Sequence, residues 1–127
     1  IDISTFTTNL NTTVSNCIAH KVVPVLVTIA DVPPGQEAKY DLYNQVIYNA
    51  AKGQNVPLFN LYALHKDSTL FDSTGKLTDS GTGNQADFTA AGLKFGVNQS
   101  NLNLLQILEQ IKQTVPLPQE AIPGGTQ

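Results

Sequence analysis

Three side chains that could do acid–base or metal chemistry follow the most apolar segments of the chain. Asp31 comes directly after one apolar run, and His65 and Asp67 come after the next. Because ligands in open α/β sheets bind beyond the carboxyl ends of the strands, these residues could share one sheet edge with Asp87. Such a cluster could transfer protons or hold a metal ion. The alternative is that all four are solvated loop residues.

The candidate nucleophiles stand in poor positions for catalysis. Ser73 follows Asp72 in a turn-rich segment, with neither a strand nor a glycine before it. Cys17 falls on the apolar stripe of an expected helix, a position typical of a buried, inert thiol. His20 lies at the end of that helix, where a cation suits the helix dipole. We therefore expect a helix-terminal histidine there and not a general base.

Four tyrosines suggest a binding surface in place of a catalytic site. Tyr40, Tyr43, Tyr48 and Tyr62 could form a sugar-binding surface, because a tyrosine combines an apolar ring with a polar tip. The helical spacing around Tyr43 makes that residue a core or interface residue first. The sugar-binding surface is therefore kept as an alternative.

Helical and strand patterns alternate along the chain and would position these groups. Apolar residues recur at three- and four-residue spacing over residues 4–19 and 36–52, and again after Ser100, which predicts three helices. The continuous β-branched runs 22–29 and 56–63 predict strands that are buried on both faces. Strand, helix and strand in this order form a βαβ unit with a right-handed crossover.

Turn-rich and proline-rich sequence fills the rest of the chain. A small hairpin around Asp72–Gly75 is expected within residues 69–78. The last residues are rich in Pro and Gly, which favours an extended backbone. We therefore expect a single α/β domain over residues 1–115 and an extended tail over residues 116–127.

The predicted fold class is α/β, with a small parallel sheet, at least one βαβ unit and a C-terminal helix; the family resemblance described below implies that these elements form part of a three-layer, flavodoxin-like sandwich. Two strands are few, because sheets usually contain about four to six. Strands that are buried on both faces also need neighbours at their edges. We expect upstream sequence, a second chain or a copy of the same chain to supply these neighbours.

Composition excludes several classes of function. The 127 residues suffice for one domain of ordinary size. Seven lysines without any arginine do not make the basic footprint of a nucleic-acid-binding protein. No apolar run reaches the ~20 residues of a membrane span. A single cysteine excludes an internal disulfide and metal sites built on cysteine pairs, and no cofactor is expected.

The balance of polar residues indicates a location. Only 13% of the residues are charged, whereas Asn, Gln, Thr and Ser together number 40. This balance suits an extracellular or cell-surface protein. Two N-x-S/T sequons, at Asn11 and Asn98, would matter in a source that glycosylates its proteins.

Five segments carry a resemblance to a known family. They read HKVVPVLVTI at 20–29, YNQVIYNAA at 43–51, NVPLFNLY at 55–62, FTAAGLKFG at 88–96 and NLNLL at 101–105. In pattern and order, residues 5–113 resemble the second half of SGNH/GDSL-type hydrolases. The resemblance implies a three-layer α/β fold and, in the whole family domain, carboxylic ester hydrolysis by a serine nucleophile.

The segments of this sequence that resemble the family lack its catalytic groups or have other residues in their place. Its Gly-Asp-Ser nucleophile motif and its oxyanion-hole Gly and Asn belong to the half that precedes the similar segments. Its late Asp-x-x-His aligns with Asn84 and Asp87. A carboxylate with a pKa near ~3.9 is a poor base for a serine hydroxyl at neutral pH. An Asp-to-Asn change in the orienting role costs about four orders of magnitude in serine proteases.

Three functions remain open on this basis. The first is a non-catalytic, SGNH-hydrolase-like extracellular module used for binding or assembly. The second is the C-terminal part of a serine ester hydrolase (a lipase, esterase or carbohydrate deacetylase) that a missing N-terminal half completes. The third is a small sugar-binding domain. The expected partners are the N-terminal half or copies of the chain itself, and the expected ligand is a carbohydrate or an acyl ester.

Overall fold

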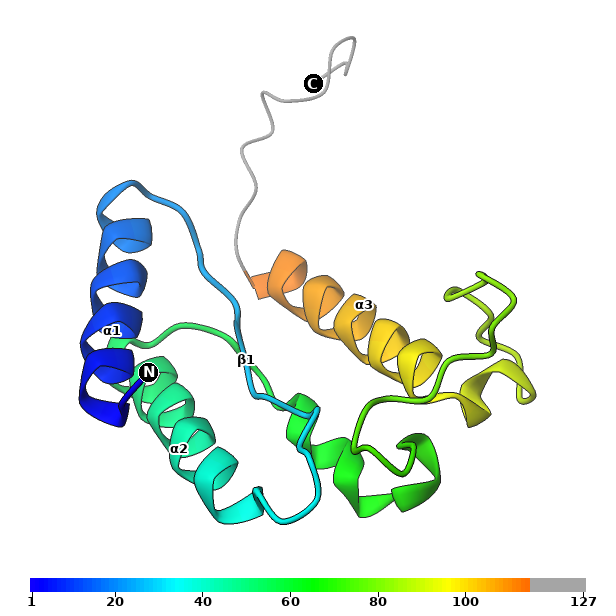
Figure 1. Ribbon diagram of the computed structural model, residues 1–127. Coiled ribbons are helices and arrows are strands. Elements are labelled where there is room, and N and C mark those ends of the chain that lie inside the picture. The colour runs from blue at the N-terminus through cyan, green and yellow to red at the C-terminus, as the bar shows by residue number, and fades with distance from the viewer. Residues whose placement is uncertain (115–127) are drawn as a thin grey trace, which may run out of the picture.

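The computed structural model describes residues 1–114, and the tail expected over 116–127 lies outside these described residues. Two N-terminal helices pack together on one side of a small sheet, and a long C-terminal helix lies on its other side (Figure 1). This arrangement confirms the coarse prediction of a mixed α/β chain with a small parallel sheet and a C-terminal helix. None of the helices described is long and apolar enough to cross a membrane.

Helix α1 spans Ile3–Ala19, close to the predicted range. Asp2 caps its start, because the Asp2 carboxylate accepts a hydrogen bond from the backbone N–H of Thr5 at 2.9 Å. The helix ends where Lys21 adopts a left-handed backbone conformation with a φ of 59°. His20 is an exposed helix-terminal residue, and its Nδ1 lies 2.8 Å from the carbonyl oxygen of Asn16.

Helix α2 spans Glu37–Gln54 and supplies most of the core. Ile47, Ala50 and Ala51 are buried and form one cluster with Val14 of α1 and Leu26 of the sheet. The helix ends at Asn55, which adopts the left-handed conformation typical of a C-terminal cap. Helical spacing predicts Leu42 on the buried stripe of this helix, but the structure leaves it 58% exposed.

The sheet consists of β1 (Leu26–Val27) and β2 (Leu58–Phe59), which pair in parallel and are joined through α2 as the predicted βαβ unit. The prediction of long strands buried on both faces is wrong. Leu26 faces the helices, whereas Val27 points away from them and is 41% exposed. Pairing is short because Pro57 has no N–H to donate and the chain leaves the sheet directly after Phe59.

The chain beyond the sheet runs through two 3₁₀ segments, η1 (Leu61–Lys66) and η2 (Ser68–Leu70), into the predicted hairpin. An antiparallel bridge between Phe71 and Leu77 confirms that hairpin. At its tip, Gly75 has a φ of 80°, and its carbonyl oxygen accepts a hydrogen bond from the N–H of Val32. The hairpin is thereby held against the loop that follows β1.

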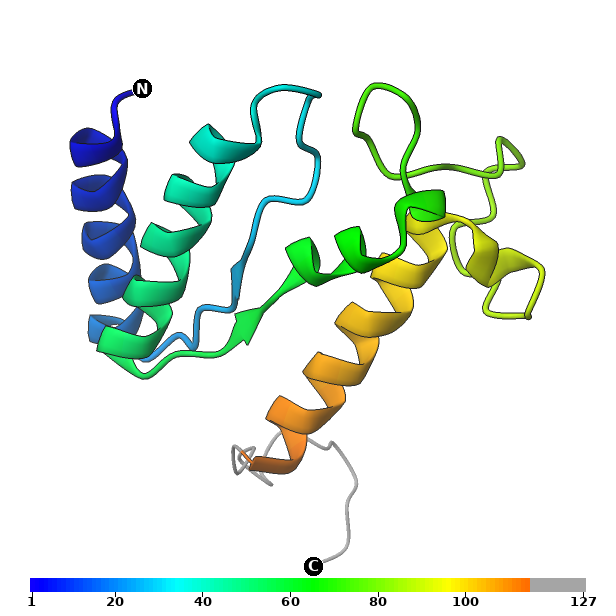
Figure 2. The ribbon, with the colours of Figure 1, turned by 90° about the horizontal axis from the view of Figure 1, so that it is seen from below.

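A last 3₁₀ segment, η3 (Gly92–Lys94), leads into helix α3, which spans Gly96–Thr114. The helix begins four residues before Ser100, the residue after which we expected it to start. The hydroxyl of Thr78 caps this earlier start, because it accepts a hydrogen bond from the N–H of Gly96 at 2.9 Å. Helix α3 contacts η1 and η2, and its far half extends away from them with Leu105 and Leu108 exposed (Figure 2).

Candidate functional site

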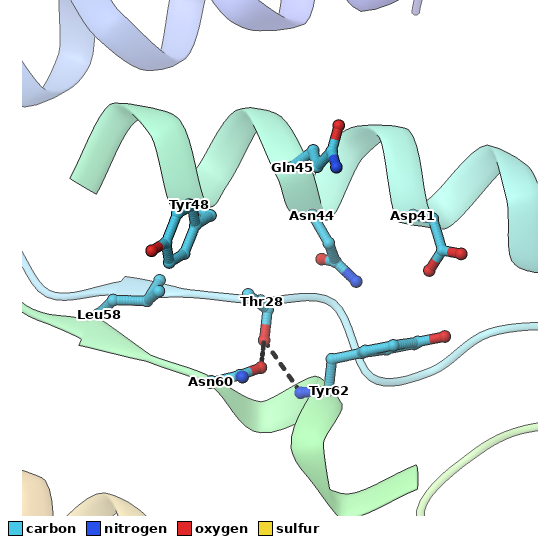
Figure 3. Close-up of a pocket in the computed structure, with 8 residues that line it drawn as sticks. All are labelled: Thr28, Asp41, Asn44, Gln45, Tyr48, Leu58, Asn60 and Tyr62. Atoms are coloured by element: carbon cyan, nitrogen blue, oxygen red, sulfur yellow. Dashed lines mark hydrogen bonds between the residues drawn. The ribbon is translucent and has the colours of Figure 1, made fainter. Parts of the chain in front are cut away.

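A pocket opens between α2 and the carboxyl ends of the two strands (Figure 3). Its volume is about 300 Å³. We call it the α2–β2 pocket; its lining residues are Thr28, Asp41, Asn44, Gln45, Tyr48, Leu58, Asn60 and Tyr62. Its place follows the general rule that ligands of open α/β folds bind beyond the carboxyl ends of the strands.

The floor of the α2–β2 pocket is fixed by the hydroxyl of Thr28, the residue that follows β1. This buried hydroxyl donates to Oδ1 of Asn60 at 3.1 Å and accepts from the backbone N–H of Tyr62 at 2.9 Å. One side chain therefore ties the end of β1 to the first residues after β2. The amide nitrogen of Asn60, Nδ2, takes no part in these two hydrogen bonds.

The wall of the α2–β2 pocket is anchored by Asn44, a buried residue of α2. Its Oδ1 accepts from the N–H of Ile29 at 2.7 Å, and its Nδ2 donates to the carbonyl oxygen of the same residue at 3.0 Å. The side-chain amide thus pairs with Ile29 as the backbone of a neighbouring strand would. Because both polar atoms are engaged, Asn44 is a positioning residue of this site.

The electrostatics of the pocket keep Tyr62 protonated. Partial burial raises the pKa of the Tyr62 hydroxyl, and the nearby Asp41 carboxylate raises it further. The hydroxyl is therefore a hydrogen-bond donor at neutral pH. The lining residues include no histidine, cysteine or serine.

Asp31 and His65 both lie in segments that follow the strands, and the structure commits both to the fold. The His65 ring stacks on Phe71 with 4.0 Å between ring centroids, and its Nε2 contacts the carbonyl oxygen of Ala30. The Asp31 carboxylate accepts from the N–H of Leu77 at 3.2 Å.

The Asp67 carboxylate is used locally. It accepts hydrogen bonds from the hydroxyl and the N–H of Thr69, and these bonds lower the pKa of Asp67. Within residues 1–114, no group of three His, Cys, Asp or Glu side chains is arranged to hold a metal ion.

Asn84 and Asp87, the two positions that align with the family's Asp-x-x-His, lie in the loop before α3. Asp87 accepts from the hydroxyl of Thr89 at 2.7 Å and from its N–H at 3.0 Å, which lowers the pKa of Asp87. The side chain of Asn84 accepts from the N–H of Ala86. Neither His20 nor His65 forms a hydrogen bond with a hydroxyl or thiol group in the described chain.

The remaining candidates divide between core and surface. Tyr43 packs edge-on against Phe6, with 5.0 Å between ring centroids, as expected for an interface residue. Of the four tyrosines, Tyr48 and Tyr62 meet in the α2–β2 pocket. The sequon residue Asn98 is 2% exposed and its amide donates to two backbone carbonyls, so that its nitrogen is not accessible to a glycan in the folded chain.

Of the eight lining residues, only Tyr48 and Tyr62 were predicted as possible site residues. The missed Thr28 and Asn60 are neutral, and only their position directly after a strand would have indicated them. Comparison of the chain with protein-family models, curated proteins and solved structures finds no match.

Proposed function

We propose that the chain is a non-catalytic, extracellular α/β module, similar to the second half of an SGNH-type hydrolase, that functions by assembling with another polypeptide along β1. The preferred partner is an upstream half of the same fold, and a second copy of the chain is the alternative. The observation that carries the proposal is the outer edge of β1, along which no second strand of residues 1–114 pairs.

Hydrogen bonds define this outer edge. The N–H groups of Leu26 and Thr28 donate to the carbonyl oxygens of Pro57 and Phe59 in β2. In a parallel ladder, the peptide groups of the residue between them, Val27, point away from β2. Asn44 occupies the next such position, at Ile29, whereas Val27 is exposed and open to pairing with another strand.

The helices support an additional strand on that side. Val14 of α1 and Leu26 of β1 belong to the same core cluster as α2, so both helices cover one face of the sheet. A strand that preceded α1 and paired with the outer edge of β1 would make α1 the crossover helix of a second βαβ unit. Such a strand would complete part of the three-layer sandwich.

Catalytic silence is the second part of the proposal. It is supported by the placement of His20, His65 and Asp87, each of which is engaged with backbone or with a neighbouring threonine. The purified chain is expected not to hydrolyse short p-nitrophenyl esters above background. Turnover that a serine-directed fluorophosphonate abolishes would contradict this part.

Light scattering tests the assembly. The chain at micromolar concentration is expected to form a species larger than 13.6 kDa, or to bind an added upstream half. Val27→Lys places a charge on the edge strand and is expected to abolish association. Val22→Lys, at an exposed position outside the strand, is the matched control and should associate normally. A wild-type monomer that unfolds cooperatively and binds no upstream half would overturn the proposal.

A further inference from the structure

The α2–β2 pocket has the size and access of a site for one small ring. Its volume of about 300 Å³ lies at the lower end of the ~300–1,000 Å³ typical of small-molecule sites. Tyr48 is 51% exposed although it lines the pocket, so a large aromatic surface remains available to a ligand. A single-ring molecule could cover that surface and still reach the strand ends.

The polar groups of the pocket are partly engaged and partly available. Thr28 and Asn44 use their polar atoms to hold the strand ends and the wall. Among the hydrogen bonds of residues 1–114, the side chain of Asn60 takes part through Oδ1 only, which leaves its Nδ2 as a donor. The Asp41 carboxylate projects from α2 toward the strand ends as an acceptor, and Tyr62 adds a protonated hydroxyl (Figure 3).

This set of groups selects a class of ligand. Hydroxyl groups both donate and accept, so a polyol can satisfy the amide donor of Asn60 and the acceptor of Asp41 at once. The carboxylate disfavours phosphate and other anions. The ring of Tyr48 offers an apolar face to the C–H face that a sugar ring presents.

We propose that the α2–β2 pocket binds a neutral polyhydroxylated ligand of the size of one sugar ring, with Tyr48 as the stacking platform and Asp41, Asn60 and Tyr62 as the hydroxyl-binding groups. The proposal does not rest on the assembly along β1. The pocket shares Asn44 with the outer edge of β1 at Ile29, but the groups proposed to bind the ligand do not include Val27, the residue that the assembly would pair.

The test is an NMR titration of the full chain with methyl β-glucoside, methyl β-galactoside, methyl α-mannoside and N-acetylglucosamine. Saturable shifts of the side-chain amide signals of Asn60 and Gln45 are expected with at least one sugar, at millimolar affinity. Tyr48→Ala is expected to weaken binding about tenfold, the usual effect of losing one aromatic contact. Tyr62→Phe keeps the ring, removes the donor and is expected to weaken binding several-fold.

The control is Tyr40→Ala, because Tyr40 lies on the same helix but outside the pocket. This variant should bind sugar as the wild type does. The absence of saturable shifts with all four sugars would overturn the proposal, and so would equal weakening by Tyr40→Ala and Tyr48→Ala. Tighter binding of methylammonium or of inorganic phosphate than of any sugar would also overturn it.

Discussion

The chain is held together in two different ways on the two sides of residue 60. The N-terminal region, from α1 to β2, has a continuous apolar core of Val14, Leu26, Ile47, Ala50 and Ala51. The region from η1 to the start of α3 has few buried apolar side chains. There, short turns are stabilised by side-chain hydrogen bonds: Asp67, Asp72 and Asp87 each accept hydrogen bonds from a threonine two residues further on.

Close backbone packing is the second feature of the polar region. A Cβ at Gly75 would lie 1.9 Å from the carbonyl oxygen of Val32, and one at Gly96 would lie 2.2 Å from that of Leu70. The buried amide of Asn98 holds two further carbonyl groups. The contrast shows that an apolar core stabilises the N-terminal region, whereas hydrogen bonds from particular polar residues and close backbone contacts fix the conformation of the region after residue 60.

The largest effect is expected from a charge in the apolar core. Ile47 is 5% exposed, so Ile47→Asp would bury an unpaired carboxylate at a cost of several kcal/mol. Against a total stability of roughly 5–15 kcal/mol, this change should unfold the domain or nearly so. Circular dichroism during heating measures it. Leu42→Asp, on the exposed side of α2, is the control and should melt as the wild type does.

Val46 refines this first test. Because the structure leaves Val46 partly exposed, Val46→Asp should destabilise the domain less than Ile47→Asp does. Equal melting temperatures for Ile47→Asp and the wild type would show that the apolar region does not depend on this face of α2.

The next largest effect is expected in the polar region, at Asn98. Asn98→Ala removes the donor to the carbonyl groups of Asp87 and Gly92. The Gly92 carbonyl still accepts from the N–H of Phe95, so the main cost is the Asp87 carbonyl that loses this donor, about 1–3 kcal/mol. Urea unfolding should therefore show a clear loss of free energy of unfolding. Asn101→Ala removes one exposed bond to Gln85 and should change that free energy little. Similar small losses for both variants would contradict the specifying role of Asn98.

Substitutions at Gly75 and Gly35 separate the effect of close packing on the stability of the hairpin from the effect of a left-handed backbone. Gly35 and Gly75 share a φ of 80°, but a Cβ at Gly35 would meet nothing within 4 Å. Gly35→Ala should therefore cost only the left-handed conformation, about 1–2 kcal/mol. Gly75→Ala adds a clash with the backbone of Val32 and should cost more in the same urea experiment. If the two variants lose the same free energy, the contact between hairpin and loop contributes nothing.

The sequence predicted the helices of the apolar region well and the strands poorly. Helical periodicity gave α1 and α2 to within about two residues, because amphipathic spacing reports directly which face is buried. The apolar runs 22–29 and 56–63 showed which residues prefer a strand, but strand length depends on where a partner runs alongside. In the structure, only Leu26–Val27 and Leu58–Phe59 find one.

The sequence named Tyr48 and Tyr62 of the α2–β2 pocket as possible binding residues, but not the polar residues beside them. The rule that ligands bind beyond strand ends led to Asp31, His65 and Asp67, which have titratable side chains. The structure commits these residues to the fold and places the neutral Thr28 and Asn60 at the pocket instead. A neutral side chain carries no signal of chemistry in the sequence, and its role depends on hydrogen bonds that only the folded chain reveals.

The smallest effect is expected from pH, and in the polar region it can be followed at Asp72. Hydrogen bonds from the hydroxyl and N–H of Thr74 and from the N–H of Lys76 lower the pKa of Asp72 below its ordinary value of 3.8. A carboxyl group whose pKa is lower in the folded than in the unfolded chain stabilises the fold above its unfolded-state pKa. This contribution is lost as the pH falls through the lower, folded-state pKa.

The turn at Asp72 should therefore hold at pH 5 and loosen only in more acidic solution. In an NMR titration, the amide proton of Thr74 should shift as Asp72 is protonated, with a midpoint below the ordinary carboxyl value. Asp72→Asn keeps the acceptor oxygen and removes the titration, so its Thr74 amide should not shift. The amide protons of Ala50 and Ala51, in the apolar core, should stay unchanged over the same range. A Thr74 midpoint at or above the ordinary value would mean that the turn does not favour the ionised carboxylate, and the polar region would then need another source of order.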